Sequence, residues 1–554
     1  MTRALLVSLS AFVVAIAVIN PTGDFPLNDD WSYGSAVKGL VEQGVYRLSD
    51  WTAMPLLTQV MWGSLFCLPR GFSFTALRLS TLTMSLLALV CLLLMIRRTG
   101  ESRPSILLAG GLCLLFDPVW LGLSNTFMTD VHFIALALLS LHLLAIGMES
   151  GRLSTLALGI ASAVLATLIR QVGILIPVGF GLGYLTRHRP RPRDLLLALI
   201  FLSLTVAAYV LYSLLLASGP GLPAAYNAHF DRIVATLGSG LPAILGLVGQ
   251  NLLTTLIYLG LFMLPLNLLL LGSMSRPRLA LFFSVSLAVL VLFNLLNLTL
   301  PGNILTDRGL GPFTLARPED FSSFSGSLVS RAVFGGLAFL GIGLLLESLR
   351  RIARSLHGNA VSVMLVAFLA CYFLSFCLSR QFDRYMLGYL PLLVVLTVQA
   401  LRGIKVRAWN RSVALTCAGL YGLFSVAATH DYLAWNRARW HALDHLTEEL
   451  AVSPAEIDGG FEFNGWHGFS HEYQRAPGRS WWWVEDDAYK VALGPLPGYD
   501  TFKEYPTGTW LPGSVRRVYL LRKSGFRPPD DNPLRHVAAA TAGLGPSGET
   551  GAGR

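Results

Sequence analysis

Long apolar segments recur along most of this 554-residue chain and are separated by short polar clusters. Stretches such as 72–96 and 359–378, if helical, cover much of a hydrocarbon core that is about 30 Å thick. Only 13% of the residues are charged and 53% are hydrophobic, whereas a soluble domain carries about 25% charged residues. Backbone groups inside a bilayer must bond within their own segment, so the pattern predicts an all-α polytopic membrane protein.

The apolar pattern predicts about thirteen transmembrane helices. They lie near residues 4–19, 72–96, 104–120, 130–148, 153–169, 171–186, 193–216, 248–272, 279–299, 330–348, 359–378, 385–401 and 412–429. The first could instead be a cleaved signal peptide, because Ala15-Ile16-Ala17 resembles a cleavage site. The apolar run continues past that site, which favours an uncleaved anchor.

The charges between these segments predict how the chain is oriented. Connections after the even-numbered segments are mostly rich in arginine, as in RHRPRPR and LRRIARSLHG, whereas those after odd-numbered segments carry mixed charge. Since basic loops stay in the cytoplasm, the N-terminus is predicted to be cytoplasmic, in a cell (inner) membrane. The chain from about residue 430 is then periplasmic or extracellular, and the net charge of +10 is first a signal of topology.

The first outer loop, residues 20–70, begins with the acidic pair Asp29-Asp30 in the sequence NDDWSY. Two short segments follow, GSAVKGLVEQG and WTAMPLLTQVMWGSLFCL, and both are typical of helices that lie along the membrane interface. Packing or re-entrant segments are the alternative. The two carboxylates could simply be solvated, or they could take part in chemistry at the outer face.

Other charged residues are predicted on the same face. Asp130 begins the fourth segment and could cap that helix or act as an acid. Arg170 interrupts an apolar stretch and could extend to the interface, hold an anion or neutralise a carboxylate. Arg380 and Arg384 run against the topology bias, so they favour either a bound phosphate or an intramolecular pair such as Asp383 with Arg384.

Carboxylates and arginines on one face suit the transfer of a group away from a phosphate leaving group. One carboxylate would deprotonate or orient the acceptor, while arginines, a metal ion or both would stabilise the phosphate. An apolar groove between the helices would hold a lipid tail.

The last part of the chain differs in composition. Residues 431–530 carry a helical stretch followed by aromatic and β-branched segments with turn residues, which predicts a small extramembrane α+β domain. Residues 531–554 are predicted to be disordered. The remaining residues, 1–430, form the membrane module.

The acidic pair after the first apolar segment, the stretch SNTFMTDVHF and the segment RQFDRYMLGYLP resemble the GT-C superfamily of membrane glycosyltransferases. The nearest branch includes protein O-mannosyltransferases and the lipid A aminoarabinose transferase. The resemblance covers most of residues 1–430 and implies a polyprenyl-phosphate-linked sugar donor with inverting transfer at the outer face. The family's proline-rich continuation of the first loop is weak here, so acceptor specificity is not carried over.

By position in these motifs, the resemblance implies roles for individual residues. Asp29 matches the general base or acceptor-orienting acid, and Asp30 stands where the family commonly has Glu. Asp130 matches the second acid. Arg384 and Tyr385 match a late basic-aromatic pair near the donor phosphate, and Tyr33 matches an aromatic that often follows the acids. Apart from the resemblance, Arg380 and Arg170 are candidates for the donor phosphate. Tyr33, Tyr385 and Lys38 are candidates for the shape of the substrate site.

The sequence therefore predicts a hexosyl- or pentosyltransferase with a lipid, glycan or protein acceptor. Its partners are the lipid-linked donor, the acceptor and membrane lipids, with no nucleic acid. The cofactor is left open, with a divalent metal ion as one candidate and no metal ligand assigned. The alternative function is a multi-pass transporter or flippase of lipid-linked sugars, against which the odd number of segments and the lack of an internal repeat argue.

Overall fold

The computed structural model describes residues 2–187, 191–306, 309–319, 321, 328–356, 358–379, 381–473 and 482–526. The candidate Arg380 and the predicted disordered tail 531–554 lie outside these ranges. The chain forms two compact units. The first contains Met1–Phe313, Ser322–Leu433 and Trp510–Ser514, and the second contains Thr314–Phe321, Ala434–Thr509 and Val515–Arg554.

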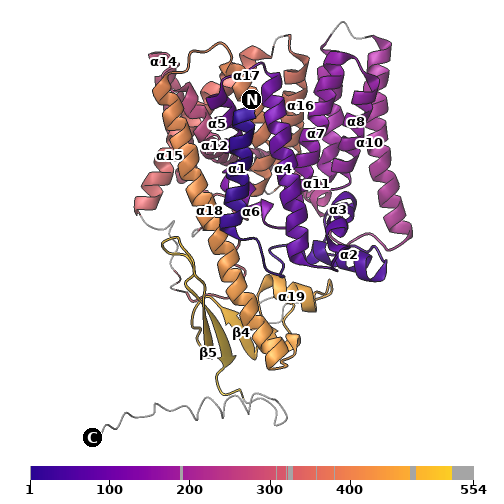
Figure 1. The fold of residues 1–554 in the computed structure, drawn as a ribbon, viewed down its shortest axis with the longest axis vertical. Coiled ribbons are helices and arrows are strands. Elements are labelled where there is room, and N and C mark those ends of the chain that lie inside the picture. Colours follow the sequence, from indigo (N-terminus) through magenta and orange to yellow (C-terminus); the bar gives the residue numbers. More distant parts are fainter. Residues whose placement is uncertain are drawn as a thin grey trace. The chain divides into compact units, whose positions relative to one another are not determined.

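The first unit consists of helices, many of them long and side by side (Figure 1), and α18 continues from it into the second unit. They are α1 (Thr2–Ile19), α2 (Asp30–Gln43), α3 (Leu57–Cys67), α4 (Phe74–Arg98), α5 (Pro104–Leu115), α6 (Pro118–Ser124), α7 (Thr129–Ser150), α8 (Leu153–Thr167), α9 (Leu175–Leu185), α10 (Pro192–Ser218), α11 (Ala228–Gly238), α12 (Leu241–Phe262), α13 (Leu264–Asn267), α14 (Arg276–Leu295), α15 (Leu328–Ser355), α16 (Ala360–Cys377), α17 (Leu390–Leu401) and α18 (Ala408–Asp444).

This unit also has short connecting elements. The 3-10 helices η1 (Gln171–Ile174), η2 (Leu268–Leu270) and η4 (Asp383–Gly388) precede or follow longer helices, and β1 (Leu305–Thr306) pairs with β2 (Gly309–Leu310).

The apolar helices confirm a multi-pass membrane protein. Within the described ranges, eight helices are long and apolar enough to cross a membrane, or nine if the pair α5 and α6, bent by 61°, is one span. Four of the other predicted segments contain shorter apolar helices, at Arg3–Ile19, Leu153–Thr167, Gln171–Leu185 and Leu390–Leu401. Each predicted segment thus contains an apolar helix, but length and composition do not establish thirteen spans.

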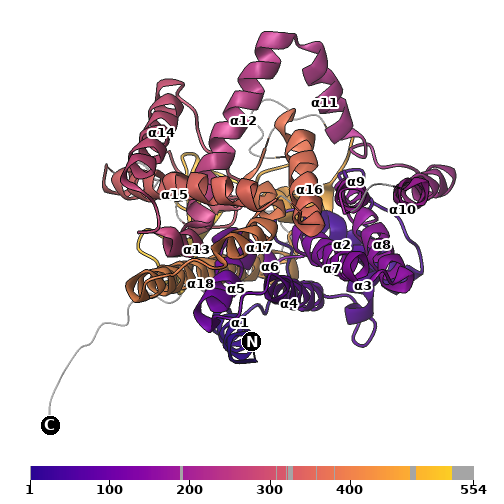
Figure 2. The same cartoon turned by 90° about the horizontal axis from the view of Figure 1, so that it is seen from above.

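Helix α7 lies in the interior of the bundle. Of its most apolar window, 83% is buried, against 22% for α10 and 11% for α14. Viewed from above, α7 has α4, α8 and α16 as neighbours, while α10 and α14 lie at the periphery (Figure 2). Leucines exposed along α10 and α14 suit contact with lipid tails, so only the buried helices can hold a polar site away from lipid.

Close packing between helices depends on glycine. A Cβ atom added to Gly159 of α8 would lie 2.8 Å from Leu144 Cγ of α7, and one on Gly147 would lie 2.5 Å from Leu156 Cδ2. Gly183 of α9 similarly approaches the backbone of α16, where a Cβ would lie 2.6 Å from the Ala360 carbonyl. Small residues let α7 approach α8, and α9 approach α16, more closely than larger side chains would allow.

The first outer loop forms α2 and α3, which lie at one end of the bundle (Figure 1). Helix α2 begins at Asp30 and ends before Gly44, whose φ of 67° is the left-handed conformation that terminates helices. The acidic pair therefore stands at the N-terminus of α2.

The second unit is a small α+β fold, which confirms the strand-containing C-terminal region. It contains the end of α18, the helix α19 (Phe461–Gly468) and the strands β3 (Ile457–Asp458), β4 (Tyr489–Ala492), β5 (Tyr499–Pro506) and β6 (Arg517–Lys523). The strand order is β3-β4-β6-β5, with β3 parallel to β4 and the other pairs antiparallel. The buried pair of Arg439 and Glu462, 2.7 Å apart, joins α18 to α19 within this unit.

Candidate active site

Asp29 is the residue immediately before α2, and its side chain is half-buried. Trp51 Nε1 donates a hydrogen bond of 2.9 Å to Asp29 Oδ1, and the indole of Trp51 lies 6.1 Å from that of Trp31. Trp51 therefore holds the carboxylate from one side, and Trp31 lies next to Trp51. Asp29 is therefore an oriented acid that keeps part of its surface exposed.

Asp30 is buried, with 1% of its surface exposed. Its carboxylate accepts hydrogen bonds from the backbone N–H groups of Leu27, at 3.3 Å, and Phe127, at 2.9 Å. Burial raises the pKa of Asp30 to about 8, although these bonds and the nearby Arg78 act in the opposite direction. Asp30 thus ties the first outer loop to the segment before α7.

Arg78 of α4 supports the chain that leads to Asp30, although the sequence did not predict a functional role for it. It is 1% exposed and donates to the carbonyls of Pro21 (3.1 Å), Gly23 (2.5 Å) and Phe25. The available signal was that Arg78 is the only charged residue inside the apolar segment 72–96. An ionisable residue at such a position points to a buried partner or a functional site.

Three residues from separate parts of the chain form a charged cluster. Asp130, in the first turn of α7, pairs with Arg170 through Oδ1 and with Arg384 through Oδ2, the latter at 3.5 Å. All three side chains are at least nine-tenths buried. Arg170 lies at the junction of α8 and η1, and Arg384 lies in η4. Three roles were predicted for Arg170. The structure shows one of them, because the Arg170 guanidinium neutralises the carboxylate of Asp130.

Tyr385 and Tyr33 complete the surroundings of this cluster. The guanidinium groups of Arg170 and Arg384 lie 5.5 Å and 5.6 Å from the Tyr385 ring centroid. Tyr33 of α2 is buried and interacts electrostatically with Asp29, Asp130 and both arginines. Burial raises the pKa of Tyr33 well above its usual value, so its hydroxyl stays protonated and can donate.

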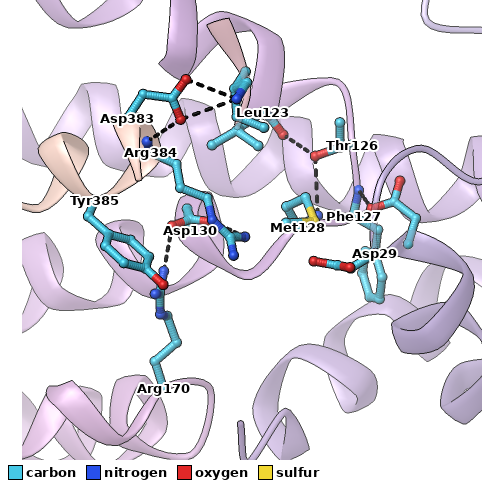
Figure 3. A network of polar contacts seen from close by, with 12 residues as sticks. Asp29, Leu123, Thr126, Phe127, Met128, Asp130, Arg170, Asp383, Arg384 and Tyr385 are labelled. Carbon is cyan, nitrogen blue, oxygen red and sulfur yellow. Dashed lines mark hydrogen bonds and ion pairs between the residues drawn. The ribbon is translucent and has the colours of Figure 1, made fainter. Parts of the chain in front are cut away.

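The charge balance of the cluster leaves an excess of positive charge. Two guanidinium groups share the single carboxylate of Asp130, and Arg384 Nε is buried with no hydrogen-bond partner in the described part of the chain. The Asp29 carboxylate points toward Arg384 in Figure 3 and interacts with it electrostatically. Asp130, Arg170 and Arg384 together carry one net positive charge, so the two arginines could bind an anionic group beside Asp29.

Asp383 positions Arg384 without pairing with its guanidinium. Its carboxylate accepts from the backbone N–H groups of Ile304 (2.9 Å), Leu305 (2.6 Å) and Arg384 (2.7 Å). Burial raises the pKa of Asp383 to about 6, against the lowering effect of these bonds. One predicted alternative was an ion pair between the side chains of Asp383 and Arg384. In the structure the Arg384 guanidinium pairs with Asp130 instead (Figure 3).

Lys38, a candidate for the substrate site, lies near Phe72. It is half-buried on α2, with its Nζ 6.0 Å from the centroid of Phe72. As for a metal ion, no group of three or more His, Cys, Asp or Glu side chains is arranged to hold one within the residues described. The structure therefore brings together Asp29, Tyr33, Asp130, Arg170, Arg384 and Tyr385, with Asp30 directly behind them.

Comparisons with known proteins bear on this part of the chain. Residues 55–216 match the family model described as dolichyl-phosphate-mannose-protein mannosyltransferase. This range includes Asp130 and Arg170. Among curated protein sequences, none matches the chain.

Solved structures resemble the fold at low sequence identity. The crystal structure of ArnT from Cupriavidus metallidurans bound to undecaprenyl phosphate has a TM-score of 0.50 and 13% identity, covering 96% of this chain and 99% of that chain. The apo state of the same protein gives a TM-score of 0.41 and 15% identity, over 80% and 71% of the two chains. The arabinosyltransferase EmbB from Mycobacterium smegmatis gives 0.35 and 15%, over 77% and 40%.

The family match and the fold agree with each other. The first of these structures is matched along nearly its whole length, so the likeness includes both the helical bundle and the C-terminal region. Both findings support the resemblance predicted from the sequence: the chain has a fold like that of ArnT, and residues 55–216 match the mannosyltransferase family model.

Proposed function

We propose that this protein is a membrane glycosyltransferase that moves a sugar from a polyprenyl-phosphate-linked donor to an acceptor hydroxyl at the outer membrane face. The observation that carries the proposal is the placement of the half-buried Asp29 carboxylate beside two buried arginines that share one acid. Support comes from the mannosyltransferase family match and from the likeness to ArnT, a protein crystallised with undecaprenyl phosphate.

In this reaction the acceptor oxygen attacks the anomeric carbon of the sugar, and the bond from that carbon to the phosphate oxygen breaks. The hydroxyl proton passes to Asp29, and the bonding electrons leave with the lipid phosphate. Attack from the face opposite the leaving group inverts the anomeric configuration. Asp29 is assigned the role of base because it is the oriented and partly exposed member of the acidic pair.

Arg384 and Arg170 are assigned to the leaving phosphate. Donors that are already fixed in a site of low dielectric stabilise charge as it develops, at little cost in reorganisation. Asp130 orients both guanidinium groups, and the unpartnered Nε of Arg384 offers a donor for a phosphate oxygen. Asp30 is assigned a positioning role, because backbone N–H groups already occupy its carboxylate.

The proposal is tested with Asp29→Asn, because the amide keeps the shape of the side chain but cannot accept the proton. We expect transfer to fall by about 100-fold or more, the usual contribution of a general base. The measurement is comparative mass spectrometry of envelope glycans, lipids and proteins from cells that carry either variant as the only copy. Glu42→Gln is the matched control, since Glu42 is an exposed acid on α2. Normal transfer by the folded Asp29→Asn variant would contradict the assignment of Asp29 as the base.

A transporter or flippase of lipid-linked sugars is the second candidate function. It also needs an anion site and lipid-facing helices, but it makes no covalent product. Proteoliposomes that move a labelled lipid-linked sugar across the bilayer and leave the label on its original carrier would favour the transporter.

A further inference from the structure

A second group of charged residues lies at the opposite ends of the helices, away from the residues assigned to transfer. Glu347, near the end of α15, is fully buried. It accepts from Arg350 Nη2 at 2.6 Å, Arg351 Nε at 2.5 Å and Arg278 Nη1, on α14, at 3.5 Å. Arg351 also donates to Ser273 Oγ at 3.1 Å. One carboxylate thus gathers three guanidinium groups from two helices.

The ratio of charges distinguishes this cluster from other ion pairs at the same end of the bundle. Arg98 pairs with Glu149 one to one, and Arg103 pairs with Glu101 and with backbone carbonyls near the end of α17. In each of these pairs one positive charge is offset by one negative charge. At Glu347, three arginines face one acid, which leaves two positive charges uncompensated by the groups that contact them.

The arginines keep donors available. Arg350 Nη1 is buried and has no hydrogen-bond partner in the described ranges, and the Arg278 side chain is 37% exposed. Beside them, α14 presents apolar side chains outward, including Leu279 and Leu281, which are 39% and 57% exposed. The cluster is therefore a cationic group at the edge of an apolar, lipid-facing surface.

We propose that Glu347, Arg278, Arg350 and Arg351 form a binding site for the headgroup phosphate of an anionic phospholipid, with its acyl chains along α14. Guanidinium groups bind phosphate oxygens through paired, charge-assisted hydrogen bonds. Basic pockets between membrane helices bind anionic headgroups in the same way. Glu347 acts as the template that holds the arginines apart from one another and in place. The site does not depend on the proposed transferase activity.

The test is native mass spectrometry of the full chain, titrated in detergent with phosphatidylglycerol or phosphatidylcholine. We expect the wild-type protein to retain phosphatidylglycerol in preference to phosphatidylcholine. Arg278→Gln should weaken phosphatidylglycerol binding about tenfold, since the loss of one charge-assisted contact is worth roughly one factor of ten. Arg278→Lys keeps the charge without the fork of donors, so its affinity should be intermediate.

Arg98→Gln is the matched control, because it removes one positive charge at the same end of the bundle. Unchanged binding by Arg98→Gln supports a built site, whereas equal losses in Arg98→Gln and Arg278→Gln would mean diffuse surface charge and overturn the proposal. Equal retention of the two lipids would also overturn it. So would displacement of the lipid by inorganic phosphate at equal concentration, which would assign the cluster to a soluble anion. Thermal unfolding verifies that each variant is folded.

Discussion

Asp29 and Asp30 are adjacent and chemically identical, yet the structure gives them different surroundings. Asp29 keeps part of its surface exposed and is oriented by Trp51, whereas Asp30 is buried between two backbone N–H groups. The sequence could place both acids outside the first apolar segment. The family resemblance favoured Asp29 as the base, but the sequence could not predict the burial of Asp30, because its partner Phe127 is 97 residues further along the chain.

Because Asp30 is buried, we expect the stability of the protein to depend on pH. A carboxyl group in an unfolded chain has a pKa of about 4, whereas burial raises the pKa of Asp30 in the folded protein to about 8. Between these values the folded state binds more protons. The contribution of Asp30 to the free energy of unfolding should therefore be largest below about pH 4 and should fall as the pH rises toward about 8.

Thermal unfolding at several pH values tests this expectation. Asp30→Asn removes the titrating group and should flatten the decline in stability between about pH 5 and pH 8. Glu42→Gln, on the exposed side of the same helix, should keep the slope of the wild-type protein. An identical slope in Asp30→Asn would show that another group causes the pH dependence.

At the scale of helices, the apolar pattern predicted most of the structure. Each predicted segment contains an apolar helix, because length and hydropathy depend on local sequence alone. The pattern did not reveal the 61° bend between α5 and α6, or the 3-10 turn Asp383–Gly388 before α17. That turn is held by hydrogen bonds from the backbone N–H groups of Ile304 and Leu305 to the Asp383 carboxylate. The donors are almost 80 residues before the acceptor in the sequence.

The contact of α7 with α8 provides a prediction at this scale. Gly159→Ala places a Cβ 2.8 Å from Leu144 Cγ and 3.1 Å from the Leu144 backbone nitrogen. The helices must separate slightly, and we expect the free energy of unfolding to fall by about 1–3 kcal/mol, as for other overpacked sites. Gly249→Ala on α12 is the control, since nothing lies within 4 Å of its added Cβ. Equal thermal stability of the two variants would contradict the packing argument.

In the membrane-spanning unit as a whole, charged residues gather at the ends of the helices. The sequence predicted which residues share the outer face, because alternating loops carry different numbers of arginines. It could not predict that Asp130, Arg170 and Arg384 meet, since their contact depends on how α7, α8 and α17 pack.

The orientation of the protein is a prediction for the whole molecule. We expect an epitope tag at the N-terminus to be protected from protease in intact spheroplasts and cleaved in inverted vesicles, whereas a tag at the C-terminus shows the reverse. Protection of both tags in spheroplasts would place both ends in the cytoplasm. That result would contradict the odd number of membrane crossings and the outer location of the C-terminal region, whereas cleavage of the N-terminal tag in spheroplasts would contradict the outer location of Asp29.

The pairing of two arginines with Asp130 has a consequence for turnover. In the proposed reaction the phosphate stays with the lipid after the sugar has left, so the spent carrier presents to Arg170 and Arg384 the same anionic group as the donor did, and with one more ionisable oxygen. Guanidinium groups that stabilise the leaving phosphate therefore also retain it. We expect product inhibition by the free polyprenyl phosphate, and a rate that is limited by how quickly the carrier escapes into the bilayer.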